Sequence, residues 1–271
     1  MPELPEVETT RRGIAPHIVG KCVKQVIVRQ RRFRWPISLD FEACLQGESV
    51  VSVTRRAKYL LIKMTSGTLI AHLGMSGNLR IVQTQAPVKK HDHVDVVFDE
   101  ETVLRFNDQR RFGALLWTTQ DPLSHELLAH LGVEPLSSDF TGDYLFSQAT
   151  GRRVPVKTFL MNSHVVVGVG NIYANEALFM AGILPTRHAG ELTREVCERI
   201  TRCIQMILSK AIEQGGTTLR DFVNAQGKAG YFQQQLHVYG RDGQSCTQCT
   251  QSIEVIRLAN RSTFFCPHCQ R

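Results

Sequence analysis

An amine and a carboxylate at the start of the chain could do chemistry together. If the initiator methionine is removed, Pro2 presents a free secondary amine, and Glu3 places a carboxylate beside it. An α-amine has a pKa of about 7.7–8.0 in model peptides, so a useful fraction is neutral near pH 7. Attack by a secondary amine on a sugar C1′ gives an iminium ion, an electron sink for β-elimination, and the carboxylate can exchange protons with the sugar oxygen or the amine. From the dipeptide alone, a proline that is merely tolerated at this position is the favoured interpretation.

Four cysteines near the end of the chain have the spacing of a metal site. They form two C-x-x-C pairs with sixteen residues between them: Cys246 with Cys249, and Cys266 with Cys269. This spacing is typical of a zinc ribbon, in which four thiolates close the coordination shell and the ion is structural. Two disulfides are the alternative, and the lack of a secretory signal favours zinc. Apolar neighbours predict buried, reduced thiols for the remaining four, which are Cys22, Cys44, Cys197 and Cys203.

A basic stretch holds a second candidate for acid–base chemistry. Lys58 follows Arg55 and Arg56, and cationic neighbours destabilise the charged form of a lysine. A surface lysine near phosphates is an equally good interpretation. Further basic clusters lie at 29–34, 110–111 and 152–157, and the net charge is +7. Many basic proteins bind no nucleic acid, but four clusters in a chain without an acidic block favour a phosphate polymer as partner.

Two glycine-containing turns, at 72–77 and 107–113, could act on a DNA duplex. An enzyme that works on a base must take it out of the stack. Met75 and Phe112 could fill the gap as apolar wedges, and an arginine such as Arg110 could hydrogen-bond the orphaned base. The residues alone favour another interpretation, in which Met75 and Phe112 are core residues at strand ends.

Two smaller features suggest contacts with an anion or a metal. Gly168 and Gly170 precede Asn171, and such a turn either presents backbone N–H groups to an anion or simply begins a helix. His91 and His93 alternate on one strand face, but a third metal ligand is missing. DNA contact or a structural role is therefore the favoured interpretation of these histidines.

Secondary-structure patterns predict how these residues are positioned. The first fifteen residues predict a helix, and Thr193 is the expected N-cap of a long amphipathic helix that ends before Gly215. Between them the pattern predicts short strands without intervening helices, which indicates a sandwich or a barrel. Their expected ranges are 21–28, 50–56, 59–64, 68–72, 79–82, 93–98, 102–106 and 114–118. The segment 144–225 is expected to be helical, and the tail 227–271 is polar and turn-rich.

Length and composition exclude some classes of protein. A chain of 271 residues with 42% hydrophobic residues can bury a core without disulfides. No apolar run reaches the roughly 18 residues that span a bilayer, and the acidic start is not a secretory signal. A soluble intracellular protein is therefore expected.

Together the motifs resemble one family, the bacterial formamidopyrimidine-DNA glycosylases. The segment 1–9 resembles the N-terminal signature of that family, and the match runs from end to end of the chain. The other similar motifs follow in the family's order: Arg56-Ala57-Lys58-Tyr59-Leu60, His72-Leu73-Gly74-Met75-Ser76-Gly77, Arg110-Arg111-Phe112-Gly113, Gly168-Val169-Gly170-Asn171-Ile172-Tyr173-Ala174, Gln214-Gly215-Gly216-Thr217-Thr218 and the terminal cysteines.

The resemblance implies a multidomain α+β fold with three domains. These are a two-layered N-terminal β-sandwich with an N-terminal helix (1–130), a linker and helix-two-turn-helix domain (131–225) and a C-terminal zinc-finger β-hairpin (226–271). It implies one structural zinc ion held by the four terminal cysteines. Damaged double-stranded DNA is the implied partner, for a monomer in the bacterial cytoplasm that needs no membrane and no obligate protein partner.

The resemblance also implies an activity and roles for single residues. The implied activity is excision of oxidised purines, such as 8-oxoguanine and formamidopyrimidines, followed by β- and δ-elimination at the abasic site. Pro2 would be the Schiff-base nucleophile and Glu3 the proton donor in base excision. Lys58 and Arg261 would be the proton donors of β- and δ-elimination. The implied DNA contacts are His91, Arg110, Arg152, Lys157 and Asn171, with Met75, Arg110 and Phe112 filling the void.

Three residues depart from the family's pattern, and two other functions compete. Gln109 and Ala229 stand where proline is common, and Asn162 stands where aspartate is usual. The departures affect loop shape and therefore lesion preference. A related type of enzyme, endonuclease VIII, excises oxidised pyrimidines, but it resembles Pro-Glu-Gly-Pro at its start, where this chain has Leu4. A zinc-bearing DNA-binding protein without activity is the non-enzyme alternative.

Overall fold

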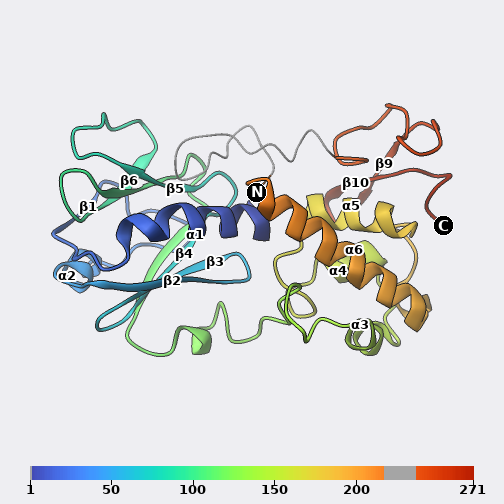
Figure 1. Ribbon diagram of the computed structural model, residues 1–271, viewed down its shortest axis with the longest axis horizontal. Coiled ribbons are helices and arrows are strands. Elements are labelled where there is room, and N and C mark those ends of the chain that lie inside the picture. The colour runs from blue at the N-terminus through green and yellow to red at the C-terminus, as the bar shows by residue number, and fades with distance from the viewer. Residues whose placement is uncertain (1, 217–235) are drawn as a thin grey trace. The chain divides into compact units, whose positions relative to one another are not determined.

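The chain folds into two compact units in the computed structural model, which describes residues 2–216 and 236–271 (Figure 1). In its described part, the first unit contains 2–129 and 214–216, and the second contains 130–213 and 236–271. The first stretch of the first unit ends at residue 129, next to the expected boundary at residue 130. The helical segment 142–213 and the cysteine-rich tail share the second unit, and the division into three domains stays a prediction.

The predicted N-terminal helix is present as α1 (Leu4–Ile18). Pro5 lies in its first turn, where a missing N–H costs no hydrogen bond. The helix continues past Gly13 and ends after Pro16, beyond the expected end. Its Val7 and Ile14 side chains are buried and belong to the core of the first unit.

Two four-stranded antiparallel sheets form the rest of the first unit (Figure 1). Their orders are β1-β6-β7-β5 and β2-β3-β4-β8. The strands are β1 (Gln25–Val28), β2 (Val50–Arg56), β3 (Tyr59–Met64), β4 (Thr68–His72), β5 (Asn78–Val82), β6 (Asp92–Val97), β7 (Val103–Asn107) and β8 (Ala114–Thr118). One hydrophobic core contains buried side chains from α1 and from both sheets, so the predicted sandwich is confirmed.

The differences from the predicted elements are local. β2, β3, β4 and β8 have the expected bounds, whereas β1 begins at Gln25 instead of Lys21. Cys22 makes only an isolated bridge to Ser49, so the ladder is interrupted before β1. A short helix, α2 (Phe41–Leu45), and a 3-10 turn, η1 (Pro122–Ser124), complete this unit.

The second unit contains the predicted helices and a terminal hairpin. Its elements are α3 (Gly142–Ala149), α4 (Val156–Leu160), α5 (Asn171–Ala181), a 3-10 turn η2 (Ala189–Glu191), α6 (Arg194–Glu213), β9 (Glu254–Leu258) and β10 (Arg261–Phe265). The Val196 N–H donates to the Thr193 hydroxyl at 3.3 Å, which confirms the expected cap of α6. None of the helices in the described ranges is long and apolar enough to cross a bilayer.

The isolated cysteines follow the prediction only in part. Cys197 and Cys203 are buried, and burial raises the pKa of Cys197 to about 11, so this thiol is inert at neutral pH. Cys22 is exposed and Cys44 is half-buried, so the prediction of a buried thiol was wrong for Cys22. The interrupted strand before β1 leaves the Cys22 side chain on the surface.

Candidate active site and nucleic-acid interface

The candidate nucleophile and acid lie at the first turn of α1. Pro2 and Glu3 are buried, and the Glu3 N–H donates to the Glu6 carboxylate at 2.8 Å. The Glu3 side chain accepts in return from the Glu6 backbone, which completes a capping box. Gly216 has a φ of +81°, and a Cβ there would lie 3.1 Å from a Glu6 carboxylate oxygen. The chain after α6 therefore passes close to this turn, and glycine suits the position.

Lys58 lies in the two-residue turn that joins β2 to β3. Ala57 in this turn has a φ of +54°, and Arg56 pairs with Tyr59. Glu8 on α1 lies 3.5 Å from the Arg55 guanidinium near the end of β2. The start of α1 therefore runs beside the strand end that leads to Lys58.

His72 at the end of β4 is a neutral group next to these cations. Burial, followed by the positive charges of Lys58 and Arg34, lowers the pKa of His72 to about 4. The Gly74 N–H donates to its Nδ1 atom at 3.0 Å, which requires that Nδ1 carry no proton. The sequence interpretation assigned no role to His72, although this residue opens one of the motifs that carry the family resemblance.

The two expected wedge residues do not lie in the core. Phe112 is 41% exposed, and the Arg110 guanidinium lies 4.8 Å from its ring centroid. Met75 is half-buried and does not belong to the hydrophobic core. The interpretation as core residues at strand ends was therefore wrong for Phe112, because the turn after β7 directs its ring to the surface.

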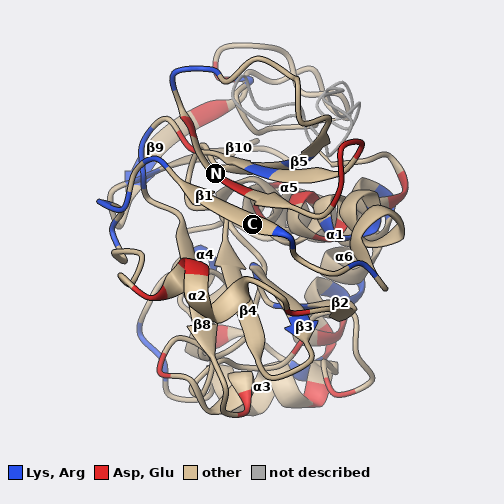
Figure 2. Ribbon diagram, turned by 90° about the vertical axis from the view of Figure 1, so that its left-hand side faces the viewer, with Lys and Arg blue, Asp and Glu red and all other residues tan. Residues whose placement is uncertain are grey.

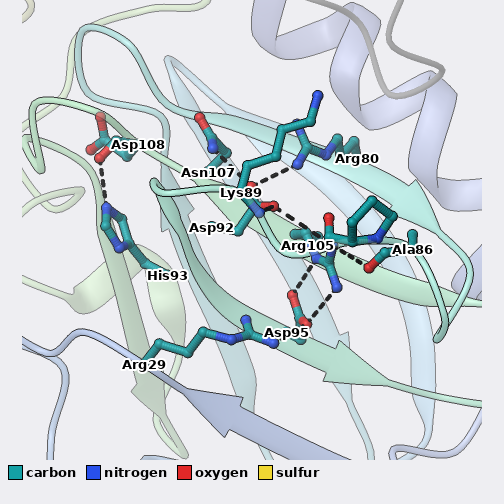
Figure 3. A network of polar contacts seen from close by, with 11 residues as sticks. Arg29, Arg80, Ala86, Lys89, Asp92, His93, Asp95, Arg105, Asn107 and Asp108 are labelled. Carbon is teal, nitrogen blue, oxygen red and sulfur yellow. Dashed lines mark hydrogen bonds and ion pairs between the residues drawn. The ribbon is translucent and has the colours of Figure 1, made fainter.

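His91 and His93 differ in what they contact. The Nε2 atom of His93 donates to the Asp108 carbonyl oxygen at 2.9 Å, which makes this histidine structural (Figure 3). Burial is the main reason why the pKa of His93 is lowered. His91 is half-buried, its ring lies 6.1 Å from that of His93, and its carbonyl oxygen accepts from the Asp108 N–H.

A buried ion network supports the segment that leads to His91 (Figure 3). Arg105 on β7 is 2% exposed and donates two hydrogen bonds to Asp95, at 2.8 and 2.9 Å. Its remaining Nη1 atom contacts the carbonyl oxygens of Ala86 and Pro87, both at 3.2 Å. Burial opposes ionisation of Asp95, but the hydrogen bonds from Arg105 and Arg29 lower its pKa. Sequence patterns missed this network because Arg105 occupies a strand position that normally predicts an apolar or exposed residue.

Arg261 lies at a tight turn of the hairpin in the second unit. Ala259 and Asn260 form the two-residue turn between β9 and β10, with φ values of +46° and +61°. Arg261 is exposed and opens β10. A cavity of about 380 Å³ beside the turn is lined by Arg152, Asn162 and Arg261 together with Lys157 and apolar side chains. One cavity thus contains the expected DNA contacts Arg152 and Lys157 and the expected δ-elimination acid Arg261. Asn162, which stands where the family usually has aspartate, lines the same cavity.

Lys157 and Asn171 hold the β9–β10 hairpin through hydrogen bonds to the backbone of β10. Lys157 is 1% exposed, and its ammonium donates to the Ser262 carbonyl oxygen at 2.9 Å and to the Thr263 hydroxyl at 2.6 Å. The Asn171 amide donates to the same Ser262 oxygen at 3.0 Å. Further along α5, the Asn175 Oδ1 atom accepts from the Phe264 N–H at 2.9 Å. The Lys157 ammonium is therefore engaged inside the unit, and a direct phosphate contact would require it to leave these partners.

The four terminal cysteines converge on one point. Their sulfur atoms all lie within 4.8 Å of one another, with Sγ–Sγ distances of 3.9 Å for Cys246–Cys269 and 3.4 Å for Cys249–Cys266. A disulfide has sulfurs about 2.05 Å apart, whereas Zn–S bonds of about 2.3 Å fit the wider separation seen here. In residues 2–216 and 236–271 this is the one group of three or more potential ligands placed to hold a metal ion.

A buried carboxylate anchors the chain just before the cysteine cluster. Glu176 on α5 is fully buried and accepts backbone N–H bonds from His237, Val238 and Tyr239 at 2.8, 2.9 and 2.8 Å. Charge-assisted bonds of this kind are the stronger class of hydrogen bond. Glu176 was missed from the sequence, but a charged residue among apolar neighbours in a helix is a signal for such an anchor.

Lys and Arg residues are spread over loops, strands and helices of both units (Figure 2). Those expected to contact DNA are not all alike in exposure: Arg110 and Arg152 are exposed, whereas Lys157 is buried. Ala229, one of the three residues that depart from the family's pattern, lies outside the described residues.

Three family models match successive parts of the chain. The formamidopyrimidine-DNA glycosylase N-terminal domain matches residues 1–115, and the H2TH domain of the same family matches residues 131–223. A zinc finger found in FPG and IleRS matches residues 243–271. The cysteine cluster therefore lies in a zinc-finger domain, and the four sulfurs hold one structural zinc ion.

Curated relatives and solved structures agree with these matches. The chain is 57% identical to the formamidopyrimidine-DNA glycosylase of Pseudomonas entomophila and 55% identical to that of Colwellia psychrerythraea, over 100% of both chains in each case. The crystal structure of MutM (Fpg) from Thermus thermophilus has a TM-score of 0.89 and 38% identity, covering 99% of this chain and 98% of that one. A Lactococcus lactis Fpg in complex with DNA that contains an abasic site has a TM-score of 0.90 and 34% identity, covering 99% of both chains.

Proposed function

Since this chain belongs to the formamidopyrimidine-DNA glycosylase family, we propose that it is a bifunctional base-excision repair enzyme. It removes oxidised purines, such as 8-oxoguanine and formamidopyrimidines, from duplex DNA and then cuts the strand on both sides of the abasic site. The observation that carries this proposal is the full-length family match together with Pro2 and Glu3 at the start of α1. The enzyme acts as a monomer in the bacterial cytoplasm.

The proposed reaction begins with the amine that removal of Met1 exposes. The Pro2 nitrogen attacks the sugar C1′ atom and gives up its own proton, the bond from C1′ to the base breaks, and the base leaves with a proton. Glu3 supplies a proton in this step, and its place beside Pro2 in the first turn of α1 suits that role. The C1′–O4′ bond then opens as O4′ takes up a proton, which leaves an iminium ion. Its nitrogen comes from a secondary amine and carries no proton to lose, so the ion keeps its charge and withdraws electrons from the sugar.

Strand cleavage then uses two basic residues. Lys58 serves as the proton donor of β-elimination, and the neutral His72 beside it adds no further positive charge to the site. Arg261 serves as the proton donor of δ-elimination, and its exposed position at the hairpin turn makes it accessible to DNA.

DNA contacts are proposed for six side chains. His91, Arg110, Arg152 and Asn171 contact the DNA, and Met75, Arg110 and Phe112 fill the void left by the extruded base. The role proposed for Lys157 changes: since its ammonium is buried, it acts on DNA through the hairpin that carries Arg261. Zinc bound by Cys246, Cys249, Cys266 and Cys269 holds that hairpin to the rest of the tail and takes no part in the chemistry.

The test is reductive trapping of the covalent intermediate. The processed enzyme is incubated with a duplex containing 8-oxoguanine opposite cytosine in the presence of borohydride, and the covalent adduct is measured. Substitution of Pro2 by glycine or chemical blocking of the Pro2 amine should reduce the adduct sharply. Undiminished trapping would mean that another nucleophile acts.

Two further duplexes separate the competing functions. A thymine glycol duplex that is cut faster than the 8-oxoguanine duplex would favour the endonuclease VIII type of activity. Binding to abasic-site DNA without any cleavage would favour a DNA-binding protein that has no enzymatic role.

A further inference from the structure

Two turns of the first unit touch each other through their backbones. One follows β4 and carries Met75, and the other lies between β7 and β8 and carries Arg110 and Phe112. Gly74 has a φ of +62°, and a Cβ there would lie only 2.5 Å from the Gly113 nitrogen and from the Phe112 carbonyl carbon. No side chain fits between the two turns, so their backbones are in direct contact at Gly74.

A serine and an aspartate link the same two turns. The Ser76 hydroxyl donates to Asp108 Oδ1 at 2.7 Å, and the Arg110 N–H donates to the Ser76 oxygen at 3.0 Å. The other carboxylate oxygen of Asp108 accepts from the Gly113 N–H at 2.8 Å. Ser76 is 4% exposed and Asp108 is fully buried, so water does not compete for these bonds.

The backbone of Asp108 is fixed as well. Its carbonyl oxygen accepts from His93 Nε2 (Figure 3). Its N–H donates to the His91 carbonyl oxygen at 3.0 Å. Every polar atom of Asp108 therefore has a partner. These partners come from β6 and the residue before it, from the turn after β4 and from the turn of Asp108 itself. A buried network in which all groups are satisfied holds its members in one geometry.

We infer that Ser76 and Asp108 are positioning residues that join Met75, Arg110 and Phe112 into one preorganised wedge. This inference rests on the proposed function, in which those three side chains fill the void in the DNA stack. A wedge that must enter a duplex loses less conformational freedom on binding when its turns are already fixed. Ser76 supplies the link between the turns, because its oxygen contacts both the Asp108 carboxylate and the Arg110 backbone.

The experiment compares two substrates for the Ser76→Ala variant of the full, zinc-loaded chain. A duplex with 8-oxoguanine opposite cytosine needs the wedge, whereas a single-stranded oligonucleotide with an abasic site has no opposing base and no gap to fill. Loss of a hydrogen bond to a buried carboxylate should slow duplex excision about tenfold. Cleavage of the single strand should change less than about threefold, since its chemistry uses the same Pro2 amine but no wedge.

Ser66→Ala is the matched control. The Ser66 hydroxyl also donates to a carboxylate at 2.7 Å, that of Glu48, but at the exposed turn between β3 and β4. This variant should cleave both substrates at the wild-type rate. A second measurement uses 2-aminopurine opposite a tetrahydrofuran site, which the enzyme cannot cleave, and the fluorescence rise on binding should slow in Ser76→Ala and in Asp108→Asn.

The outcomes separate the inference from the function on which it rests. Equal loss on both substrates would indicate a general structural defect and overturn the positioning role. Unchanged duplex excision and an unchanged fluorescence rise would also overturn it. Wild-type protein that cleaves neither substrate would overturn the proposed function, and this inference with it.

Discussion

The Lys157 ammonium donates a hydrogen bond to the carbonyl oxygen of Ser262 at 2.9 Å, one residue after Arg261. This bond ties α4 to the first residues of β10, on the hairpin that carries the expected δ-elimination acid. The Lys157 ammonium therefore holds the backbone next to Arg261, and its contact with DNA stays a prediction.

Substitution of Lys157 by methionine should misplace Arg261. The change keeps the length of the side chain but leaves the Ser262 oxygen with fewer donors, which lowers the free energy of unfolding by about 2–3 kcal/mol. Product-end analysis should show less δ-elimination product and more of the β-elimination product, while base excision continues. Lys210→Met is the control, because Lys210 lies exposed in the last turn of α6. An unchanged ratio of products in Lys157→Met would contradict the supporting role.

Replacement of Glu3 by glutamine should separate base excision from strand cleavage. The amide cannot donate the proton that the leaving base needs, so excision of 8-oxoguanine should slow by about a hundredfold or more. Cleavage of a preformed abasic site needs no leaving base and should persist. The same substitution at the exposed Glu213 should affect neither reaction. Equal loss of both activities in Glu3→Gln would indicate a structural role in the capping box.

His72 should make the folded state sensitive to acid. Its pKa is about 4 in the folded protein, below the ordinary value of 6.5, so the unfolded chain binds the proton first as the pH falls. The associated stability is complete above pH 6.5 and is lost on the way to pH 4. For a half-buried group, this shift corresponds to about 2–3 kcal/mol of unfolding free energy.

A His72→Asn variant isolates that contribution. The asparagine oxygen can still accept from the Gly74 N–H, but it does not titrate. Denaturant unfolding of both proteins at several pH values should show the wild type losing more stability than the variant between pH 6.5 and 4. His93 and the buried carboxylates contribute equally to both proteins and cancel in the difference. Parallel pH profiles would show that His72 is not held neutral by folding.

The sequence predicted the sandwich strands and the zinc cluster because both depend on short-range patterns. The strand alternation of β2, β3, β4 and β8 was strong enough to fix their bounds, and the C-x-x-C spacing brought four sulfurs together. The buried polar groups could not be predicted in the same way. Asp108 and Glu176 bind partners that are distant in the sequence, 32 residues for Ser76 and 61 for His237.

The exposure of single residues was equally hard to predict. Phe112 is of a residue type that is usually buried in a core. Its ring is exposed because it lies in the turn that the Asp108 carboxylate organises. Lys157 is of a residue type that often binds phosphate on a surface. Here it is buried because it packs against β10, where its ammonium donates to the Thr263 hydroxyl. In both cases the deciding contact comes from another element, which no local pattern contains.

Removal of zinc should abolish δ-elimination by loosening the hairpin that carries Arg261. The ion links the 246–249 segment to the segment that follows β10, and four-cysteine sites contribute directly to folding free energy. Metal analysis of the purified chain should find one zinc ion per molecule, and a Cys249→Ser variant should retain much less. The same substitution at the exposed Cys22 should retain the ion and the activity, because that thiol lies in the first unit, far along the chain from the cluster. If Cys249→Ser kept its zinc and its activity on an abasic-site duplex, the tail would have to be held by its hydrophobic contacts and by Glu176 alone.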